Sequence, residues 1–248
     1  MKKILISFAN QKYAKSLNEL YSTASNPGNV DTVHAYTFEW LKDTDFYKKN
    51  RYILNKPRGA GYWLWKPYII LESFKNLKEK EGIILYSDAG LKVISDLTPL
   101  FEIAENKAKN NRMVFRLPHI GAIHLNKIWT KRDCFVLTKC NEQKYWDGNV
   151  VNGALSVWKK TEENIEFLNE WLKYLRDPRI ITDDPNMFGT NDISFRDHRH
   201  DQSVLSLLAI KYDFEIFRDP TQYGNGEKKF FSNSPYEQLF HHHRNYKH

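Results

Sequence analysis

The sequence predicts an α/β fold in which helices cover an open, mostly parallel β-sheet. Short apolar runs typical of buried strands alternate along the chain with segments that repeat apolar side chains at helical spacing. The 248 residues are 41% hydrophobic and 27% charged, and they contain no Ser/Gly linker, low-complexity tract or internal repeat. A single compact domain is therefore expected.

The N-terminal part of the chain predicts a β-α-β beginning. Residues 2–8 form an apolar run typical of a strand, residues 11–25 carry apolar side chains at helical spacing, and residues 29–38 predict a second strand. A polar segment, residues 41–61, follows these elements.

A helix and a strand are predicted next. Pro67 suits the first turn of a helix, and the apolar side chains after it recur on one face. Gly82 is expected to end this helix before the apolar run GIILYSD, residues 82–88, which predicts a buried strand.

The second half of the chain continues the alternation. Thr161 suits the N-cap of an amphipathic helix over residues 162–177. The remaining predicted elements are strands at residues 113–117, 135–137, 152–159 and 214–219, and a helix at residues 200–213.

The net charge of +7 arises from 37 Lys and Arg against 30 Asp and Glu. This balance favours partners that carry phosphates, nucleic-acid backbones or anionic membranes, and it does not distinguish among them. No segment has the roughly 20 apolar residues that a membrane span needs. Cys134 and Cys140 form no disulfide framework and indicate buried thiols in a reducing compartment. We therefore expect a cytoplasmic protein and leave open its peripheral association with the inner face of the membrane.

Asp88 follows the predicted strand at residues 82–87 and precedes Gly90. In open α/β sheets, ligands bind beyond the carboxyl ends of the strands, so this carboxylate can reach a metal or a substrate. The alternative is that Asp88 simply opens a turn.

The segment KPRGAGYWLWKP, residues 56–67, predicts a cradle for a phosphate or a sugar. Gly61 lets the backbone approach a ligand, Arg58 offers a planar fork, and Lys66 lies at the start of the predicted helix, where an anion is favoured. The segment matches neither a dinucleotide fingerprint nor a Walker loop. The alternative is an ordinary glycine-containing loop with aromatic side chains packed beneath it.

Two further segments offer polar side chains at the ends of predicted elements. Asn152 and Gly153 precede a strand and would stand at the edge of a pocket, or else form a turn. His200, Asp201 and Gln202 open a helix, where the Asp201 carboxylate would be ionised, aimed out of the scaffold and able to act as a base or a charge stabiliser. The alternative is a capped helix on a solvated surface.

The C-terminal segment HHHR supplies imidazoles and a guanidinium. His243 is a possible metal ligand and Arg244 a possible partner of a diphosphate. A basic tail that makes no fixed contacts is the alternative.

In this order, GAGYWLWKPYIILE, YSDAG, NGALSVWKKT, HRHDQSVLSLL and HHR resemble sugar-nucleotide glycosyltransferases of the GT-A type. The likeness is greatest to the small bacterial and viral enzymes that build capsule and lipopolysaccharide. The resemblance implies one GT-A-like, Rossmann-like domain over residues 1–248. Its donor-nucleotide half would span about residues 1–95, and its acceptor half and C-terminal segment about residues 96–248.

The resemblance also implies an activity and roles for individual residues. A sugar would pass from a nucleotide-diphosphate donor to a hydroxyl of a glycan or glycolipid acceptor. Lys66 matches a sugar-contacting lysine, and Asp88 matches the first acid of the metal-binding Asp-x-Asp motif, whereas Gly90 replaces the second acid. The NGAL segment, His200 and Gln202 would line the donor and acceptor pocket, and Asp201 would lie near the anomeric carbon.

Gly90 leaves two ways to neutralise the donor phosphates. Asp88 and a late histidine such as His243 would hold a divalent cation, Mn²⁺ or Mg²⁺, with oxygens of the nucleotide. Otherwise Arg58, Lys66 and Arg244 would act in place of a metal. These roles are assigned from the resemblance and from the charges on the side chains.

Two other function classes compete with this interpretation. The net charge and the interleaved lysines and aromatic residues also fit a module that binds nucleic acid or another anionic polymer. The dispersed charge and the absence of a known binding motif argue against a specific nucleic-acid partner. The missing acid at Gly90 also fits a catalytically inactive carbohydrate-binding relative.

Overall fold

The computed structural model describes residues 1–79, 81–118 and 124–243, and its centre is a six-stranded sheet. The strand order is β2-β1-β3-β6-β5-β7. All neighbouring pairs are parallel except those that include β6, which runs antiparallel to both β3 and β5. The predicted mostly parallel sheet is therefore confirmed. The strands are β1 Lys2–Ala9, β2 Thr32–Thr37, β3 Gly82–Ser87, β5 Arg112–Arg116, β6 Val151–Lys159 and β7 Ile216–Phe217.

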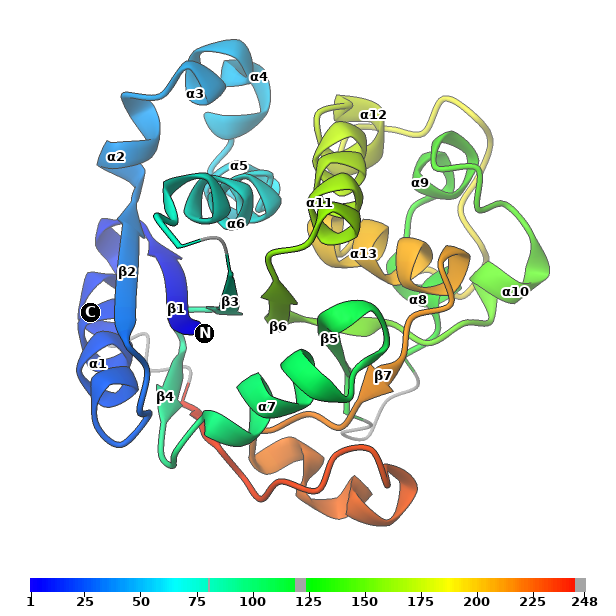
Figure 1. Cartoon of the computed structure of the whole chain (residues 1–248). Coiled ribbons are helices and arrows are strands. Elements are labelled where there is room, and N and C mark those ends of the chain that lie inside the picture. The colour runs from blue at the N-terminus through cyan, green and yellow to red at the C-terminus, as the bar shows by residue number, and fades with distance from the viewer. Residues whose placement is uncertain (80, 119–123, 244–248) are drawn as a thin grey trace.

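Helices cover both faces of this sheet (Figure 1). Alternate residues of each central strand point to opposite faces, as the period of a strand requires. In β1, Ile4 and Ile6 pack with α6, α11 and α13, while Leu5 packs with α1 and α7. The longer helices are α1 Ala14–Ser25, α6 Trp65–Asn76, α7 Thr98–Asn106, α11 Glu162–Leu175 and α13 His200–Lys211.

Short helices fill the connections between these elements. The predicted polar segment folds into a chain of short helical turns, and others follow β5 and α11. They are α2 Phe38–Lys42, α3 Asp45–Lys49, α4 Arg51–Leu54, α5 Gly59–Tyr62, α8 Asn126–Trp129, α9 Arg132–Leu137, α10 Gln143–Trp146 and α12 Pro178–Ile181, with 3₁₀ helices at Gln11–Tyr13, Lys109–Asn111 and Gln222–Phe230.

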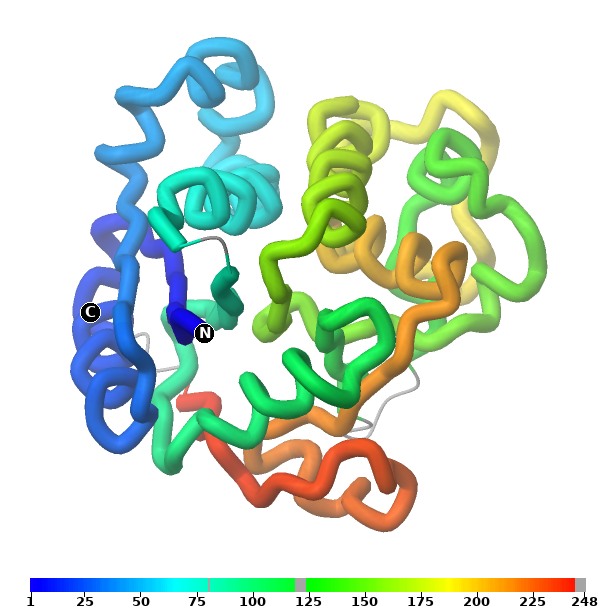
Figure 2. Tube along the Cα trace, in the orientation of Figure 1, coloured from blue at the N-terminus to red at the C-terminus, as the bar shows by residue number. Residues whose placement is uncertain are grey.

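A second, two-stranded sheet joins the C-terminal segment to the segment that follows β3. Strand β4, Leu91–Val93, pairs antiparallel with β8, Phe240–His242, and Leu91 lies opposite His242. Figure 2 shows the red end of the chain beside the segment that follows β3. Residues 88–90 and the C-terminal histidines are thereby brought together, although they are far apart in the sequence.

Most predicted elements are confirmed, and two details are wrong. The Thr161 hydroxyl accepts a hydrogen bond from the Asn164 amide at 3.2 Å, which is the predicted cap of α11. Residues 135–137 are not a strand but the end of α9, because so short an apolar run does not distinguish a strand from a buried helix. The helix before β3 ends at Asn76, and Gly82 is instead the first residue of β3.

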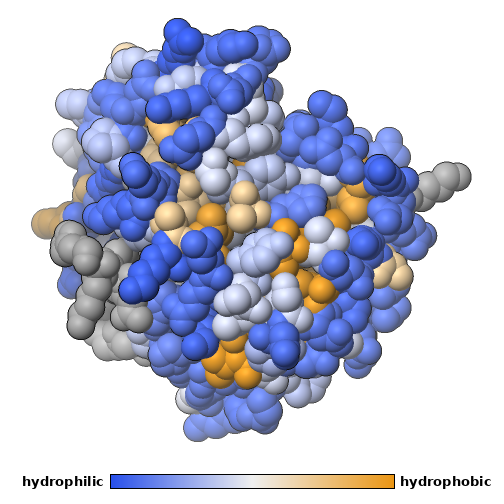
Figure 3. All heavy atoms as spheres, turned by 90° about the vertical axis from the view of Figure 1, so that its left-hand side faces the viewer, coloured by the Kyte–Doolittle hydropathy of each residue, from blue (hydrophilic) through white to orange (hydrophobic). Residues whose placement is uncertain are grey.

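The molecular surface agrees with the charged composition. Figure 3 shows a face that is mainly hydrophilic, with apolar side chains in smaller patches near its middle. Within residues 1–79, 81–118 and 124–243, no helix combines the length and apolar character that a bilayer crossing requires. Cys134 and Cys140 are both buried as free thiols, as predicted.

Candidate active site

Two adjoining cavities open at the carboxyl ends of β1 and β3, where ligands bind in open α/β sheets. The first cavity, of about 440 Å³, is lined by residues from the end of β1, the start of α1, the segment 57–65 and the segment 88–90. The second cavity, of about 570 Å³, is lined by residues from the start of β6 and of α13, among others. Trp63, Asp88 and His242 line both cavities.

Asp88 lies at the junction of the two cavities. Its backbone amide donates to the Ala154 carbonyl at 2.8 Å, which fixes the segment after β3 against β6. Its carboxylate accepts a hydrogen bond from the Tyr86 hydroxyl and remains 35% exposed. Burial and the Asp88 charge raise the pKa of Tyr86 well above its ordinary value, so the phenol stays a donor.

The antiparallel direction of β6 brings the predicted NGAL residues to the same place. Because β6 runs against β3, its first residues lie beside the end of β3, where Leu155 is paired with Ser87. Asn152 and Gly153 therefore line the second cavity. The Asn152 amide donates to the Asp219 carboxylate at 2.5 Å and accepts from the Ala154 amide at 2.8 Å, so its orientation is set.

Lys66 and Asp201 form a buried ion pair in the wall of the second cavity. The Lys66 ammonium donates to Asp201 Oδ2 at 2.6 Å and to the Gly153 carbonyl at 2.7 Å, and it lies 3.8 Å from Asp88 Oδ1. The two side chains of the pair are only 3% and 4% exposed. Burial raises the pKa of Asp201 to about 6, although Lys66 acts in the opposite direction.

This pair differs from the geometry expected from sequence. Asp201 is near the start of α13, as predicted, but its carboxylate is buried against Lys66 and does not extend freely out of the scaffold. The Lys66 ammonium faces two carboxylates and a carbonyl, an arrangement unlike an open phosphate cradle.

Arg58 also has carboxylate partners rather than an open anion site. Its guanidinium donates to Asp183 at 3.2 Å and to Asp197 at 2.6 Å, and it reaches the His198 carbonyl at 3.5 Å. These bonds fasten the segment between α12 and α13 to the segment that precedes α5. Arg58 nevertheless lines the second cavity.

The segment labelled α5 is a left-handed turn. The φ angles of residues 59–63 are +59°, +50°, +93°, +54° and +59°. The hydrogen bonds Tyr62 N to Arg58 O, 2.7 Å, and Trp63 N to Gly59 O, 3.2 Å, close successive turns. Each residue with a side chain in this conformation costs roughly 1–2 kcal/mol.

The two glycines of this turn serve its packing. A Cβ on Gly61 would stand 2.6 Å from Leu54 Cα, and a Cβ on Gly59 would stand 2.3 Å from the Trp63 ring. Gly61 is not among the described residues that line either cavity. Its close approach is to the backbone of α4, and its predicted role in approaching a ligand stays a prediction.

His200 and Gln202 complete the wall built by the start of α13. The His200 Nδ1 atom lies 2.7 Å from the Ile181 carbonyl, and burial lowers the pKa of this imidazole to about 4. His200 is therefore neutral at pH 7. The Gln202 amide donates to the Val151 carbonyl at 2.7 Å, and a Cβ on Gly153 would come within 3.1 Å of Gln202 Cβ. Gly153 thus permits close contact between β6 and α13.

Two solved structures share the fold over almost the whole of this chain. The apo crystal structure of mouse xyloside xylosyltransferase 1 matches with a TM-score of 0.51 and 10% identity, over 99% of this chain and 98% of that chain. The apo structure of the bifunctional glycosyltransferase WbbM matches with a TM-score of 0.52 and 12% identity, over 98% of this chain and 46% of that chain. This chain shares the α/β fold of these two glycosyltransferases. No family model and no curated protein matches its sequence.

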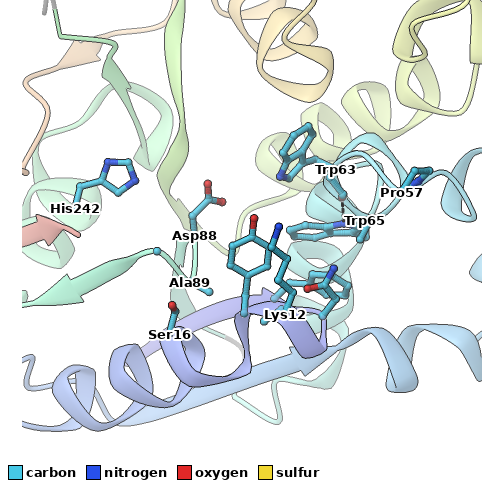
Figure 4. A pocket seen from close by; sticks show the side chains of 15 residues that line it. Lys12, Ser16, Pro57, Trp63, Trp65, Asp88, Ala89 and His242 are labelled. Carbon is cyan, nitrogen blue, oxygen red and sulfur yellow. Dashed lines mark hydrogen bonds between the residues drawn. The ribbon is translucent and has the colours of Figure 1, made fainter. Parts of the chain in front are cut away.

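The histidine beside Asp88 is His242. It lines both cavities, and Figure 4 shows Asp88 between His242 and Trp63. His243, the predicted metal ligand, instead has its Nε2 atom 3.8 Å from Glu19 Oε2, and it is not among the described residues that line the cavities. The other predicted donor contact, Arg244, lies outside the described residues.

The residues at the junction fit a divalent cation only as an ion shared with a substrate. In the described part of the chain, no group of three or more His, Cys, Asp or Glu is arranged to hold a metal. A Cβ on Gly90 would meet His242 Nε2 at 3.9 Å, so position 90 lies beside His242. Asp88 and His242 remain, and Mg²⁺ is often held by one or two protein ligands together with substrate phosphates.

Sequence reasoning missed Trp63, Asp219 and His242 as residues of this site. Asp219 follows β7 as Asp88 follows β3, so the rule used for Asp88 would have found it. Burial raises the pKa of Asp219, and its carboxylate lines the second cavity. The sequence offered no comparable signal for Trp63 or for the choice of His242 over His243.

Proposed function

We propose that this protein is a glycosyltransferase that moves a sugar from a nucleoside-diphosphate donor to a hydroxyl of a glycan or glycolipid. The observation that carries the proposal is the pair of adjoining cavities, which meet at Asp88 beside the buried Lys66–Asp201 pair. A transferase for two substrates needs two connected sites and charged groups where they meet. The GT-A-like fold supports the same reaction class.

The donor nucleotide is assigned to the first cavity. Phe8 and Trp65, whose rings stack at 4.0 Å, form part of its lining, and Asn10 adds polar groups at the end of β1. Lys12 lines the same cavity and contributes a positive charge. An aromatic and basic lining suits a base and a diphosphate.

The acceptor is assigned to the second cavity, whose lining is rich in polar side chains. Asn152, Gln202 and Asp219 belong to this lining, and the amide oxygen of Gln202, whose nitrogen donates to Val151, can accept a hydrogen bond from a sugar hydroxyl. From the sequence resemblance, we infer an acceptor of the kind found in capsule or lipopolysaccharide, with peripheral membrane association when the acceptor is a glycolipid.

The carboxylates then have distinct tasks in the transfer. The bond between the sugar and the diphosphate breaks through a state in which the sugar carries positive charge, and the leaving group is an anion. Asp201, with a pKa of about 6, is mainly ionised at neutral pH and can stabilise that charge or accept the acceptor proton. Lys66 holds its carboxylate in place. A divalent cation such as Mn²⁺ or Mg²⁺, held by Asp88 and His242 with donor oxygens, would stabilise the charge of the diphosphate.

The test is a thermal-shift screen of UDP, GDP, ADP and their sugar conjugates, with and without MnCl₂. A ligand that binds the folded state raises the melting temperature by mass action. We expect one nucleotide to stabilise the wild-type protein and to stabilise an Asp88→Asn variant less. If none of these ligands shifts the melting temperature, the assignment of the first cavity to a donor is wrong.

A catalytically inactive carbohydrate-binding protein is the second candidate, and the observation in its favour is Gly90. Slow hydrolysis of the bound nucleotide sugar in the absence of acceptor separates the two candidates. We expect the wild-type protein to release nucleoside diphosphate in this assay. Binding of the conjugate without any release, with or without Mn²⁺, would favour the inactive relative.

A further inference from the structure

The two cavities limit where the transferred sugar can lie. This inference rests on the proposed function. The bond that breaks joins the sugar to the diphosphate in the first cavity, and the new bond joins it to the acceptor in the second cavity. The sugar must therefore lie where both cavities can be reached. Trp63, Asp88 and His242 line both.

Trp63 is the apolar member of this group, and its indole borders the space next to Asp88 (Figure 4). Sugar rings carry C–H groups on their faces, and an aromatic ring is the side chain that packs best against such a surface. Asp88 and His242 offer polar contacts on the other side of the same junction in this view.

The chain holds the indole in place before any ligand binds. Trp63 is the last of five consecutive residues with positive φ, and Gly59 makes room for its ring because a Cβ there would overlap the indole. The His200 ring stacks on it at 5.7 Å, and His200 itself has a φ of +49°. Strained backbone of this kind persists where the surroundings enforce it, and it is found at ligand clamps.

We propose that Trp63 contacts the transferred sugar and thereby helps to determine which sugar the protein accepts. The left-handed turn places this indole at the junction of the two cavities. A preorganised aromatic wall favours binding because little side-chain freedom is lost when the sugar arrives. In this proposal the Trp63 indole contacts the sugar and not the nucleoside diphosphate.

The experiment compares the affinity of the nucleoside diphosphate with that of its sugar conjugate, by titration calorimetry. UDP, GDP and ADP are tested first, and the one that binds most tightly is used with its glucose, galactose and N-acetylglucosamine conjugates. The variant is Trp63→Asn, because asparagine tolerates a positive φ and removes the indole. Trp63→Phe keeps an aromatic ring, and Trp40→Ala is a control.

Trp40 suits this purpose because it is a half-buried tryptophan that packs against Tyr36 and Tyr68. It is not among the described residues that line the two cavities. Melting temperatures and circular dichroism of all variants establish that they are folded, and Trp63→Phe replaces Trp63→Asn if the latter is not.

We expect Trp63→Asn to bind the nucleoside diphosphate as the wild type does, but its preference for the sugar conjugate should fall by about three- to tenfold. Trp63→Phe should lose less, and Trp40→Ala should keep the wild-type preference. An equal loss for both ligands, or no loss for either, would overturn the assignment. Failure of the wild-type protein to bind any of the nucleotides would instead reject the proposed function, and this inference with it.

Discussion

Two ion-pair clusters join the segment 56–66 to the segment 183–201, and they differ chiefly in burial. The pair Lys66–Asp201 is almost fully buried, whereas Arg58 and its partner Asp197 are 38% and 37% exposed. In both clusters a nitrogen lies 2.6 Å from a carboxylate oxygen. Ion pairs with the same nitrogen–oxygen distance thus occur once in the interior and once near the surface.

The difference in burial reverses the sign of the pKa shift. At Asp201, burial outweighs the attraction of Lys66 and raises the pKa. At Asp197, burial also acts to raise the pKa, but the hydrogen bond and charge of Arg58 outweigh it and the pKa is lowered. A buried ion pair is costly to break, and burial brings the pKa of its carboxylate closer to neutral pH. An exposed ion pair mainly holds two segments of the chain together.

The largest expected effect follows from breaking the buried pair. Asp201→Leu leaves the Lys66 ammonium buried without the charge and without the hydrogen-bond acceptor of Asp201, so we expect a loss of about 3–5 kcal/mol in the free energy of unfolding. Turnover should fall by about a hundredfold or more if the carboxylate takes part in transfer. Denaturant unfolding and steady-state kinetics measure the two effects.

A double variant separates stability from catalysis. Lys66→Met together with Asp201→Leu replaces both charges by apolar groups, and such replacements are often neutral for stability. We expect most of the stability to return while turnover stays low. Recovery of turnover along with stability would show that the pair is structural.

Asp88 is about as exposed as Arg58 and Asp197, at 35%, but it lies 3.8 Å from the buried Lys66 ammonium. Asp88→Asn preserves an acceptor for the Tyr86 hydroxyl, so the melting temperature should change little. Turnover should fall by about a hundredfold or more, the scale of losing a preorganised charge at a reacting centre. Wild-type turnover in this variant would refute the role of Asp88.

The raised pKa of Asp201 predicts that both kcat/KM and the free energy of unfolding depend on pH. We expect these changes to be smaller than those caused by the Asp201 and Asp88 substitutions. If the ionised carboxylate is required, kcat/KM should fall about tenfold per pH unit below about pH 6. Because the folded pKa lies above the unfolded value near 4, the contribution of Asp201 to the free energy of unfolding should decrease as the pH rises from about 4 to 6. The difference between the wild type and the double variant isolates this contribution. An unchanged difference over this range would contradict the raised pKa.

The smallest effect is expected at the exposed cluster. Arg58→Gln removes two ion pairs that are each worth about 0–1 kcal/mol, so the free energy of unfolding should fall by at most about 2 kcal/mol. The loss should shrink in 1 M salt, in contrast to that of Asp201→Leu. A loss as large as that of Asp201→Leu would mean that exposure does not distinguish the two clusters.

Local patterns were enough to predict much of the fold and part of the site. Periodicity predicted β1, α6, α11 and α13, since an amphipathic or buried segment must match the geometry of its element. The position of Asp88 after an apolar strand predicted that it would line a cavity, and this placement needs no knowledge of distant residues. The division of the chain near residue 95 into donor and acceptor halves stays a prediction.

The sequence alone thus determined the layered fold and the strand-end position of Asp88, because both depend on residues that are close together in the chain. Only the tertiary structure decided that Lys66 faces Asp201, that His242 rather than His243 lines the cavities, and that Trp63 stands where they meet. These outcomes depend on the antiparallel entry of β6, the pairing of β4 with β8 and a left-handed turn. Such features arise from contacts between distant segments and from the balance between burial and charge, and neither is encoded in local spacing.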